Sequence, residues 1–172
     1  MFCAAPGGKT SILSLCMENK GNITATDIKG PRSNRLTENL RRLGVENVTV
    51  QSGDLLSQDN SLFDQNNKYD RILIDVPCSN TGVFRRRADA KWRLMPGFTK
   101  DLAQLQFRMV ESIIPLLKDG GKMVYSTCSI DDAENSQLIE KVIEKFPHLT
   151  KIDEVSLIPQ DDRDGAYAAL LG

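Results

Sequence analysis

Two cysteines occupy positions where a substrate crevice is expected. Cys78 comes shortly after the apolar residues 72–74, and Cys128 comes shortly after residues 123–125. Both apolar runs are short and typical of buried strands. In an open α/β sheet the carboxyl ends of the strands face the ligand crevice, so the two thiols are expected to share one site. Thiols in that position indicate covalent chemistry on a bound substrate.

The composition limits what these thiols can do. The only histidine, His148, follows Pro147 in a predicted surface loop, so neither a Cys/His nor a Ser/His/Asp arrangement is available. The four cysteines are widely spaced and include no Cys-x-x-Cys pair. This spacing favours thiols over a disulfide framework and disfavours a zinc site, so no metal is expected.

One reaction fits two thiols without a histidine. A thiolate adds to the electron-poor C6 of cytosine, and C5 then becomes nucleophilic enough to take a methyl group from a sulfonium. The second thiol, or a water bound to it, removes the C5 proton so that the first thiol can leave. From position alone, Cys78 and Cys128 are equal candidates for the attack. The alternative that both are small buried residues also stays open.

Residues around Cys78 add to this interpretation. Asp75, three residues earlier, can hydrogen-bond the ring at N3 and the exocyclic amine and so stabilise the developing anion. The target base must be unstacked or flipped out to present its face to a thiol. The net charge is −1, but a basic cluster follows Cys78: Arg85, Arg86, Arg87, Lys91 and Arg93. These cations can contact phosphates, although a solvated surface explains them equally well.

The first residues predict a cofactor site without a phosphate. The turn over residues 3–10 contains Gly7 and Gly8 but is neither G-x-G-x-x-G nor a P-loop. Asp27, about 20 residues further on at the end of a predicted strand, suits hydrogen bonds from a ribose diol. Asp54 ends the next strand and can reach the same nucleoside. S-adenosyl-L-methionine has a ribose and an adenine but no phosphate; alternatively, both aspartates are ordinary strand-end residues.

Strand and helix patterns alternate along the chain. The sequence predicts helices over 10–19, 31–43, 102–117 and 131–146, and strands over 22–27, 48–51, 70–75, 122–126 and 167–171. Pro115 should loosen the end of its helix, and Gly120 and Gly121 should separate that helix from the next strand. Residues 79–100 are expected to form a functional loop with one helical turn. This order predicts an α/β fold with a mainly parallel sheet and helices on both faces.

Length and composition predict a single domain. The chain has 172 residues and no apolar run long enough to span a bilayer, so no membrane association is expected. With no visible signal peptide, a cytoplasmic monomer is expected. Only Met1 and Phe2 precede the first turn, where a complete first strand is normal. Residues 1–172 are therefore expected to be a catalytic domain truncated at both ends, without an N-terminal RNA-binding region and only marginally stable alone.

Several motifs together resemble the RNA cytosine-5 methyltransferases, and most nearly the bacterial ribosomal RNA branch, Sun/Fmu-like. The motifs are residues 3–10, 75–79, 81–83 with Arg85 and Arg86, 89–93, 125–129, and Asn135 after Glu134. The resemblance extends to Tyr167. The sequence departs from the family at Asn80, where glycine is usual, at Ala88, where proline is common, and at Ala166, where an aromatic residue is expected. None of these departures removes a catalytic atom.

The resemblance implies a Rossmann-like fold that uses S-adenosyl-L-methionine to methylate RNA, in particular ribosomal RNA. It assigns the attack to Cys128 and product release to Cys78, whereas the Pro-Cys cysteine attacks in the DNA enzymes. Asp75 would lie near both the methyl donor and the base, Asp27 would hold the ribose, and Asp54 would contact the adenine side. The residues implied to wrap the methionine part are Cys3, Ala4, Ala5, Pro6, Gly7, Gly8 and Lys9.

Two other functions remain as alternatives. The first is methylation of a base amino group, which normally uses an Asp/Asn-Pro-Pro-aromatic loop and no thiol. The sequence Asp75-Val76-Pro77-Cys78 argues against it. The second is a non-catalytic module that binds the cofactor or RNA.

Overall fold

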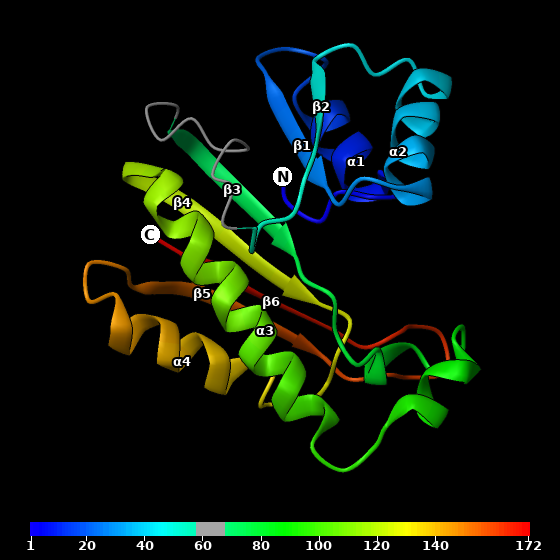
Figure 1. Ribbon diagram of the computed structural model, residues 1–172, viewed down its shortest axis with the longest axis vertical. Coiled ribbons are helices and arrows are strands. Elements are labelled where there is room, and N and C mark those ends of the chain that lie inside the picture. The colour runs from blue at the N-terminus through cyan, green and yellow to red at the C-terminus, as the bar shows by residue number, and fades with distance from the viewer. Residues whose placement is uncertain (58–67) are drawn as a thin grey trace. The chain divides into compact units, whose positions relative to one another are not determined.

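The computed structural model describes residues 1–57 and 68–172 and contains two compact units, Met1–Asn67 and Lys68–Gly172 (Figure 1). Each unit is described by itself. The cofactor turn belongs to the first unit, and both candidate thiols belong to the second.

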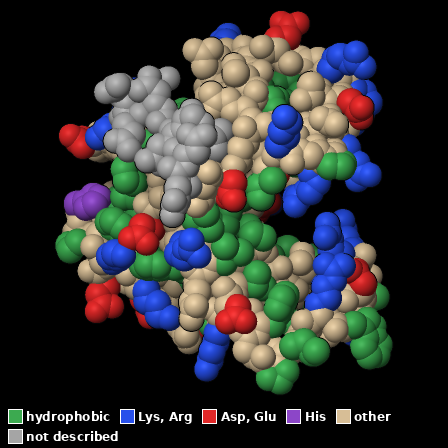
Figure 2. Space-filling model, viewed as in Figure 1, with side chains coloured by type: hydrophobic (Ala, Val, Ile, Leu, Met, Phe, Trp, Pro, Cys, Tyr) green, Lys and Arg blue, Asp and Glu red, His purple; other side chains and the backbone are tan. Residues whose placement is uncertain are grey.

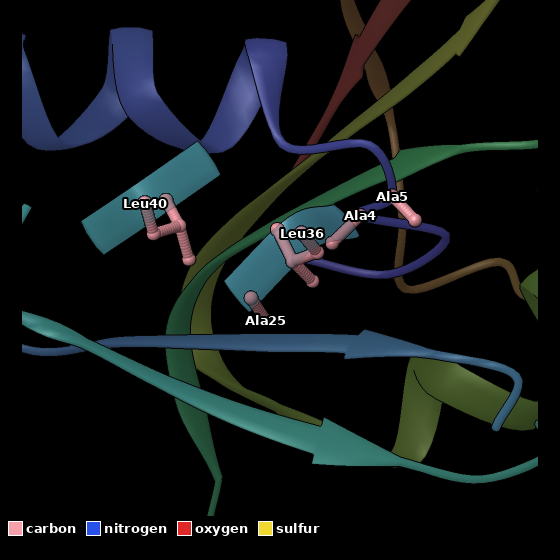
Figure 3. Close-up of a cluster of buried hydrophobic side chains, with 5 residues drawn as sticks. All are labelled: Ala4, Ala5, Ala25, Leu36 and Leu40. Atoms are coloured by element: carbon pink, nitrogen blue, oxygen red, sulfur yellow. The ribbon is translucent and has the colours of Figure 1, made fainter. Parts of the chain in front are cut away.

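The first unit alternates helix and strand. It contains α1 (Gly8–Cys16), β1 (Ile23–Asp27), α2 (Pro31–Arg42) and β2 (Val48–Ser52), and β1 pairs with β2 in parallel. Phe2 adds a parallel bridge to Thr26 of β1. The core is a cluster of Ala4, Ala5, Ala25, Leu36 and Leu40 (Figure 3). Three of these are alanines, whose small side chains let the turn at residues 4–5 pack closely against β1 and α2.

The second unit is a four-stranded mixed sheet. Its strands are β3 (Tyr69–Asp75), β4 (Leu117–Thr127), β5 (Lys151–Leu157) and β6 (Ala166–Leu171), in the order β3-β4-β6-β5. The β3–β4 pair is parallel, and the β4–β6 and β6–β5 pairs are antiparallel. Helices α3 (Phe98–Ile113) and α4 (Ser136–Lys145) both lie in front of this sheet in Figure 1. Apolar side chains of both helices are completely buried, among them Val110, Ile113 and Ile139.

The α/β class is confirmed, and the structure adds an antiparallel half to the sheet. Strand β5 was not predicted. Its apolar residues Ile152, Val155 and Leu157 do not alternate regularly, because the pairing register shifts between Lys151 and Asp153. Ile152 and Val155 are also about half exposed. A half-exposed strand with an irregular register carries a weak period-2 pattern.

The predicted boundaries of four elements need correction. The helix expected over residues 10–19 is α1, which spans Gly8–Cys16. The helix expected from residue 102 begins at Phe98 and ends at Ile113, and Pro115 lies in the following 3-10 turn η4 (Ile114–Leu116), as expected. The helix expected from residue 131 begins at Ser136, since the residues before it form turns. Gly120 and Gly121 do not precede the strand; they lie within β4, where Tyr69 pairs with Leu117 but Arg71 pairs with Lys122. Gly120 has a φ of 70°, so this irregularity depends on glycine.

The segment expected to be a loop with one helical turn contains two 3-10 turns. They are η2 (Thr81–Val83) and η3 (Ala88–Arg93). Across residues 1–57 and 68–172, no helix is both long enough and apolar enough to cross a membrane. The same residues contain no group of His, Cys, Asp and Glu side chains suited to holding a metal ion.

Candidate active site

Parallel pairing of β3 and β4 brings the two candidate thiols together. Asp75, the last residue of β3, pairs with Ser126 of β4, and the Ser126 hydroxyl donates to Asp75 Oδ1 at 2.9 Å. Cys78 and Cys128 follow these two strands, and their Sγ atoms lie 3.2 Å apart. Both thiols are half-buried. The site therefore combines two touching thiols with a carboxylate at the end of the adjoining strand.

The contact between the thiols changes their acidity. The hydrogen bond with Cys128 and burial raise the pKa of the Cys78 thiol far above its usual range, and the charge of an ionised Cys128 acts in the same direction. Two thiols in contact lose their protons one after the other, because the first negative charge opposes the second. The pair therefore holds its second proton much more firmly than its first.

The carboxylate of Glu134 connects the two loops that carry the thiols. Glu134 is completely buried. Its Oε2 accepts from the backbone N–H of Ser79, next to Cys78, at 2.9 Å, and its Oε1 accepts from the hydroxyl of Ser129, next to Cys128, at 2.9 Å. The hydroxyls of Ser79 and Ser129 also contact each other at 3.1 Å. One buried side chain thus fixes the relative position of both cysteine loops.

Gln106 and Tyr125 form hydrogen bonds that hold Glu134 in position. Gln106 Nε2 donates to Glu134 Oε2 at 2.7 Å and to the carbonyl of Pro77 at 2.9 Å. The Tyr125 hydroxyl donates to the Glu134 carbonyl at 2.7 Å, and its oxygen lies 3.2 Å from Gln106 Oε1. Burial raises the pKa of Tyr125, so it remains a donor. The sequence reasoning missed these roles, although a glutamine in the buried stripe of Met109 and its neighbours was a usable signal.

The Cys128 loop has a second set of constraints. The Thr127 hydroxyl donates to Asn135 Oδ1 at 2.7 Å, and Asn135 Nδ2 donates to the Ser129 carbonyl at 3.0 Å. Asn80, where glycine is usual in the resembling family, adopts the left-handed conformation with a φ of 61°. Its Oδ1 accepts from the Cys128 thiol at 3.1 Å, and its Nδ2 donates to the Cys78 carbonyl at 2.9 Å. Asparagine tolerates the left-handed conformation, so Asn80 in place of glycine adds polar contacts without distorting the turn.

The cofactor turn lies directly over Asp27 in the first unit. Asp27 is 8% exposed, and its carboxylate accepts from the backbone N–H of Ala5 at 2.7 Å and of Ile28 at 2.9 Å. Gly7 has a φ of 108°, and a Cβ there would lie 2.9 Å from the Cδ1 of Leu36, so only glycine fits between the turn and α2. The buried carboxylate and the turn are therefore one preformed structure.

Other predicted cofactor residues occupy varied environments. Ala4 and Ala5 belong to the core, Cys3 is half-buried, and Pro6, Gly8 and Lys9 are exposed. Asp54 is exposed, and its Oδ1 accepts from the N–H of Leu56 at 2.9 Å, which fixes the bend after β2. His148 is exposed, in agreement with the surface position expected for it.

The donor set of this turn fits S-adenosyl-L-methionine. Among the described residues, no side chain caps the start of α1 at Gly7, and helix N-termini of this kind favour a carboxylate. The methionine carboxylate would bind there, and the remaining lone pairs of Asp27 would accept hydrogen bonds from the ribose hydroxyls. The exposed Asp54 carboxylate is a suitable acceptor for an amine of the base.

The α/β architecture, the glycine turn over a strand-end carboxylate and the paired thiols define a Rossmann-like methyltransferase. The chain matches the family of 16S rRNA methyltransferases RsmB/F over residues 1–171, and it belongs to this family. The resemblance inferred from the motifs is thereby confirmed. The expected cofactor is also confirmed at the level of the family, whose members depend on S-adenosyl-L-methionine.

Relatives with sequence and structural similarity agree with this assignment. The chain is 46% identical over 146 residues to the ribosomal RNA small subunit methyltransferase B of Yersinia pseudotuberculosis. The aligned residues make up 85% of this chain and 33% of the relative. The chain thus spans about a third of the length of the curated relatives it matches. Its fold is similar to that of NSun6 from Pyrococcus horikoshii with SFG, with a TM-score of 0.87 and 30% identity over 99% of this chain and 46% of that one.

Two further solved structures have folds similar to that of this chain. A methyltransferase homolog protein from Pyrococcus horikoshii gives a TM-score of 0.80 with 30% identity over 99% of this chain and 59% of that one. An rRNA methylase from Streptococcus thermophilus shares the fold alone, with a TM-score of 0.60 and 13% identity over 99% of this chain and 82% of that one.

Proposed function

We propose that this chain carries the site that methylates C5 of cytosine in RNA, in particular ribosomal RNA, through a covalent bond between Cys128 and C6 of the base. The observation that carries the proposal is the 3.2 Å contact between Cys78 and Cys128 at the ends of paired parallel strands. Family membership supports the RNA methyltransferase class. Methylation of an amino group would leave this thiol pair without a role.

The proposed reaction gives the two thiols different roles. The pair can supply one thiolate by losing its first proton, and we assign this thiolate to Cys128, the nucleophile that the family resemblance implies. When bound, S-adenosyl-L-methionine supplies the methyl group. While C6 forms its bond to sulfur, the ring takes up a proton at N3, and Asp75 accepts hydrogen bonds from this N3–H and from the exocyclic amine.

The release step follows from the causes of the Cys78 pKa shift. Once Cys128 Sγ is bonded to C6, it carries no negative charge and no proton to share with Cys78. Two of the causes that raise the pKa of Cys78 are then gone, so this thiol can lose its own proton to solvent. The resulting thiolate, directly or through a bound water, accepts the C5 proton. The C5–H electrons restore the C5–C6 double bond, the C6–S bond breaks, and Cys128 leaves as a thiolate.

Two cysteine variants test the proposal, with a third as the matched control. With RNA and a methyl-labelled cofactor, Cys128→Ala should abolish both methylation and the adduct. Cys78→Ala should instead accumulate a protein–RNA adduct that survives a denaturing gel. Cys16, an exposed cysteine at the end of α1, should be replaceable by alanine without effect. Methyl transfer that survives in both Cys128→Ala and Cys78→Ala would contradict the mechanism. We further propose that the enzyme acts as a cytoplasmic monomer, which light scattering during gel filtration would check.

A further inference from the structure

We infer that residues 85–95, the arginine–tryptophan segment, bind single-stranded RNA beside the target base, with Trp92 as the stacking surface for a flanking base. This inference deepens the proposed function, because it assumes that the substrate of the thiol site is RNA. The segment would hold the nucleotides on one side of the flipped cytosine.

Exposed apolar side chains gather on this segment. Trp92 is 80% exposed, Met95 is 70% exposed and Leu94 is 38% exposed. Tryptophan is normally well buried in a folded domain, so such a side chain in solvent indicates a binding surface. Figure 2 shows Lys and Arg side chains next to hydrophobic ones over the η2–η3 region, at the lower right of the view. Such a mixture of exposed apolar and cationic groups is suited to nucleic acid, which offers both base faces and phosphates.

The charges of the segment are suited to a phosphate backbone. It contains five cations, namely Arg85, Arg86, Arg87, Lys91 and Arg93, and a single anion, Asp89. Asp89 pairs with Arg93 at 2.6 Å, and Asp164 pairs with Arg86 at 2.8 Å. In the described part of the chain, no ion pair involves Arg87 or Lys91. Both exposed cations precede Trp92 in the sequence, Lys91 directly, and they are available to phosphates.

Lys91 also contacts the tryptophan itself. Its Nζ lies 5.4 Å from the centroid of the Trp92 ring. Alternating cations and an aromatic face are what single strands bind, since each nucleotide offers one phosphate and one stacking surface. A duplex hides its base faces, so the Trp92 face would be used only by an unstacked strand. The same unstacking is needed to present cytosine to a thiol.

Gly82, three residues before this segment, connects it to the thiol site. The Gly82 N–H donates to the carbonyl of Cys128 at 3.0 Å, and the Gly82 carbonyl accepts from the N–H of Gly165 at 2.7 Å. A Cβ on Gly82 would lie 2.6 Å from the Gly165 carbonyl oxygen and 2.8 Å from that of Cys128. The segment therefore begins three residues after a glycine whose backbone contacts that of the proposed nucleophile. Ala90 of η3 is only 3% exposed, so its side chain packs against the rest of the unit.

The chain offers an internal probe for the test. Trp92 is its only tryptophan, so intrinsic tryptophan fluorescence reports this position alone. A titration of the full chain with a 12-nucleotide single-stranded RNA, without cofactor, should quench that fluorescence as the RNA binds. A parallel titration follows the anisotropy of the same RNA carrying a dye. Unchanged tryptophan fluorescence at RNA concentrations that saturate the anisotropy would overturn the inference.

Variants separate stacking from charge. Trp92→Ala should weaken RNA binding about tenfold, within the range found when a base–aromatic stack is removed, and Trp92→Phe should retain most of the affinity. Arg87→Ala and Lys91→Ala should each reduce the slope of log K against log salt by about 0.7. Lys141, an exposed cation on α4, supplies the control Lys141→Ala, which should leave affinity and slope unchanged. Wild-type affinity in both Trp92→Ala and the Arg87→Ala, Lys91→Ala double variant would refute the inference.

Two comparisons remove competing explanations. Vesicles of anionic phospholipid should leave the Trp92 fluorescence unchanged, and quenching as strong as that by RNA would mean that the surface is not specific for nucleic acid. RNA binding is also measured with Cys128→Ala, which cannot form an adduct. Normal binding together with methyl transfer that survives in Cys128→Ala would refute the thiol mechanism while leaving the RNA surface intact.

Discussion

The sulfur atoms of Cys78 and Cys128 lie 3.2 Å apart although 50 residues separate them in the sequence. The contact exists because β3 and β4 are parallel neighbours that end in register, with Asp75 opposite Ser126. The carboxyl ends of both strands therefore meet at the same edge of the sheet. Buried polar side chains then hold the two loops in place.

The acidity of Cys78 predicts an unusual pH dependence of alkylation. Because the hydrogen bond with Cys128 and burial raise its pKa, Cys78 should react slowly with iodoacetamide at neutral pH, and its rate should still rise above pH ~9.5. A thiol of ordinary pKa, about 8.5, would have levelled off by then. Mass spectrometry of the modified peptide measures the rate. In Cys128→Ala the rise should move to lower pH, and identical profiles in the two proteins would contradict the coupling.

Removing the negative charge of Glu134 should loosen both cysteine loops. Glu134→Gln replaces one acceptor oxygen by an NH2 group, which then faces the N–H of Ser79 or the hydroxyl of Ser129. A buried donor left without a partner costs about 1–3 kcal/mol, so the free energy of unfolding should fall by about 2 kcal/mol. Urea denaturation measures this change.

The matched control for Glu134, which precedes α4, is a glutamate on that helix. Glu144 is exposed on α4, and Glu144→Gln should change the stability by less than about 0.5 kcal/mol. Methylation and adduct formation should fall together in Glu134→Gln. A stable Glu134→Gln protein with full activity would show that the carboxylate does not position the loops.

A methyl group at Gly82 should disturb the backbone around the nucleophile. Gly82→Ala places a Cβ within 3 Å of two carbonyl oxygens, those of Gly165 and Cys128. Overpacking of this kind costs about 1–3 kcal/mol, so a thermal scan should show a Tm lower by about 4–8 °C. Gly8→Ala, where the Cβ would have nothing within 4 Å, should not lower the Tm. An equal effect of the two substitutions would show that the close approach at Gly82 has no special cost.

The carboxylate of Asp27 should be needed for cofactor binding. Asp27→Asn keeps the size of the side chain but removes one acceptor from the N–H groups of Ala5 and Ile28 and from any bound ribose. Titration calorimetry with S-adenosyl-L-methionine should show an affinity at least about tenfold lower, as expected for the loss of a charge-assisted hydrogen bond. Asp162→Asn, at an exposed position, should bind as the original chain does. An unchanged Kd for Asp27→Asn would exclude this carboxylate from the cofactor site.

Much of the fold was accessible from the sequence because the parallel strands are apolar and short. The apolar runs before Cys78 and Cys128 predicted β3 and the end of β4. Because both cysteines follow the carboxyl ends of these strands, their proximity was predicted too. The edge strand β5 escaped because its register shift at Lys151 and Asp153 removes the alternation on which such predictions depend.

The supporting residues were harder to predict because their roles depend on contacts between distant segments. Glu134 bonds to Ser79, 55 residues earlier, and Gln106 bonds to Pro77, 29 residues earlier. A local pattern does not contain such pairings. Only the polarity of Gln106 within an apolar helical stripe hinted at them.

The position of β4 in the strand order has a consequence for motion. Within the second unit, β4 is hydrogen-bonded to β3 on one side and to β6 on the other, with Ser126 paired to both Asp75 and Ala168. Amides in such an interior strand exchange with deuterated solvent only when the sheet itself opens. Cys128, the proposed nucleophile, directly follows β4, so we expect the strand that leads to it to open rarely and the RNA to adapt its shape to the thiol.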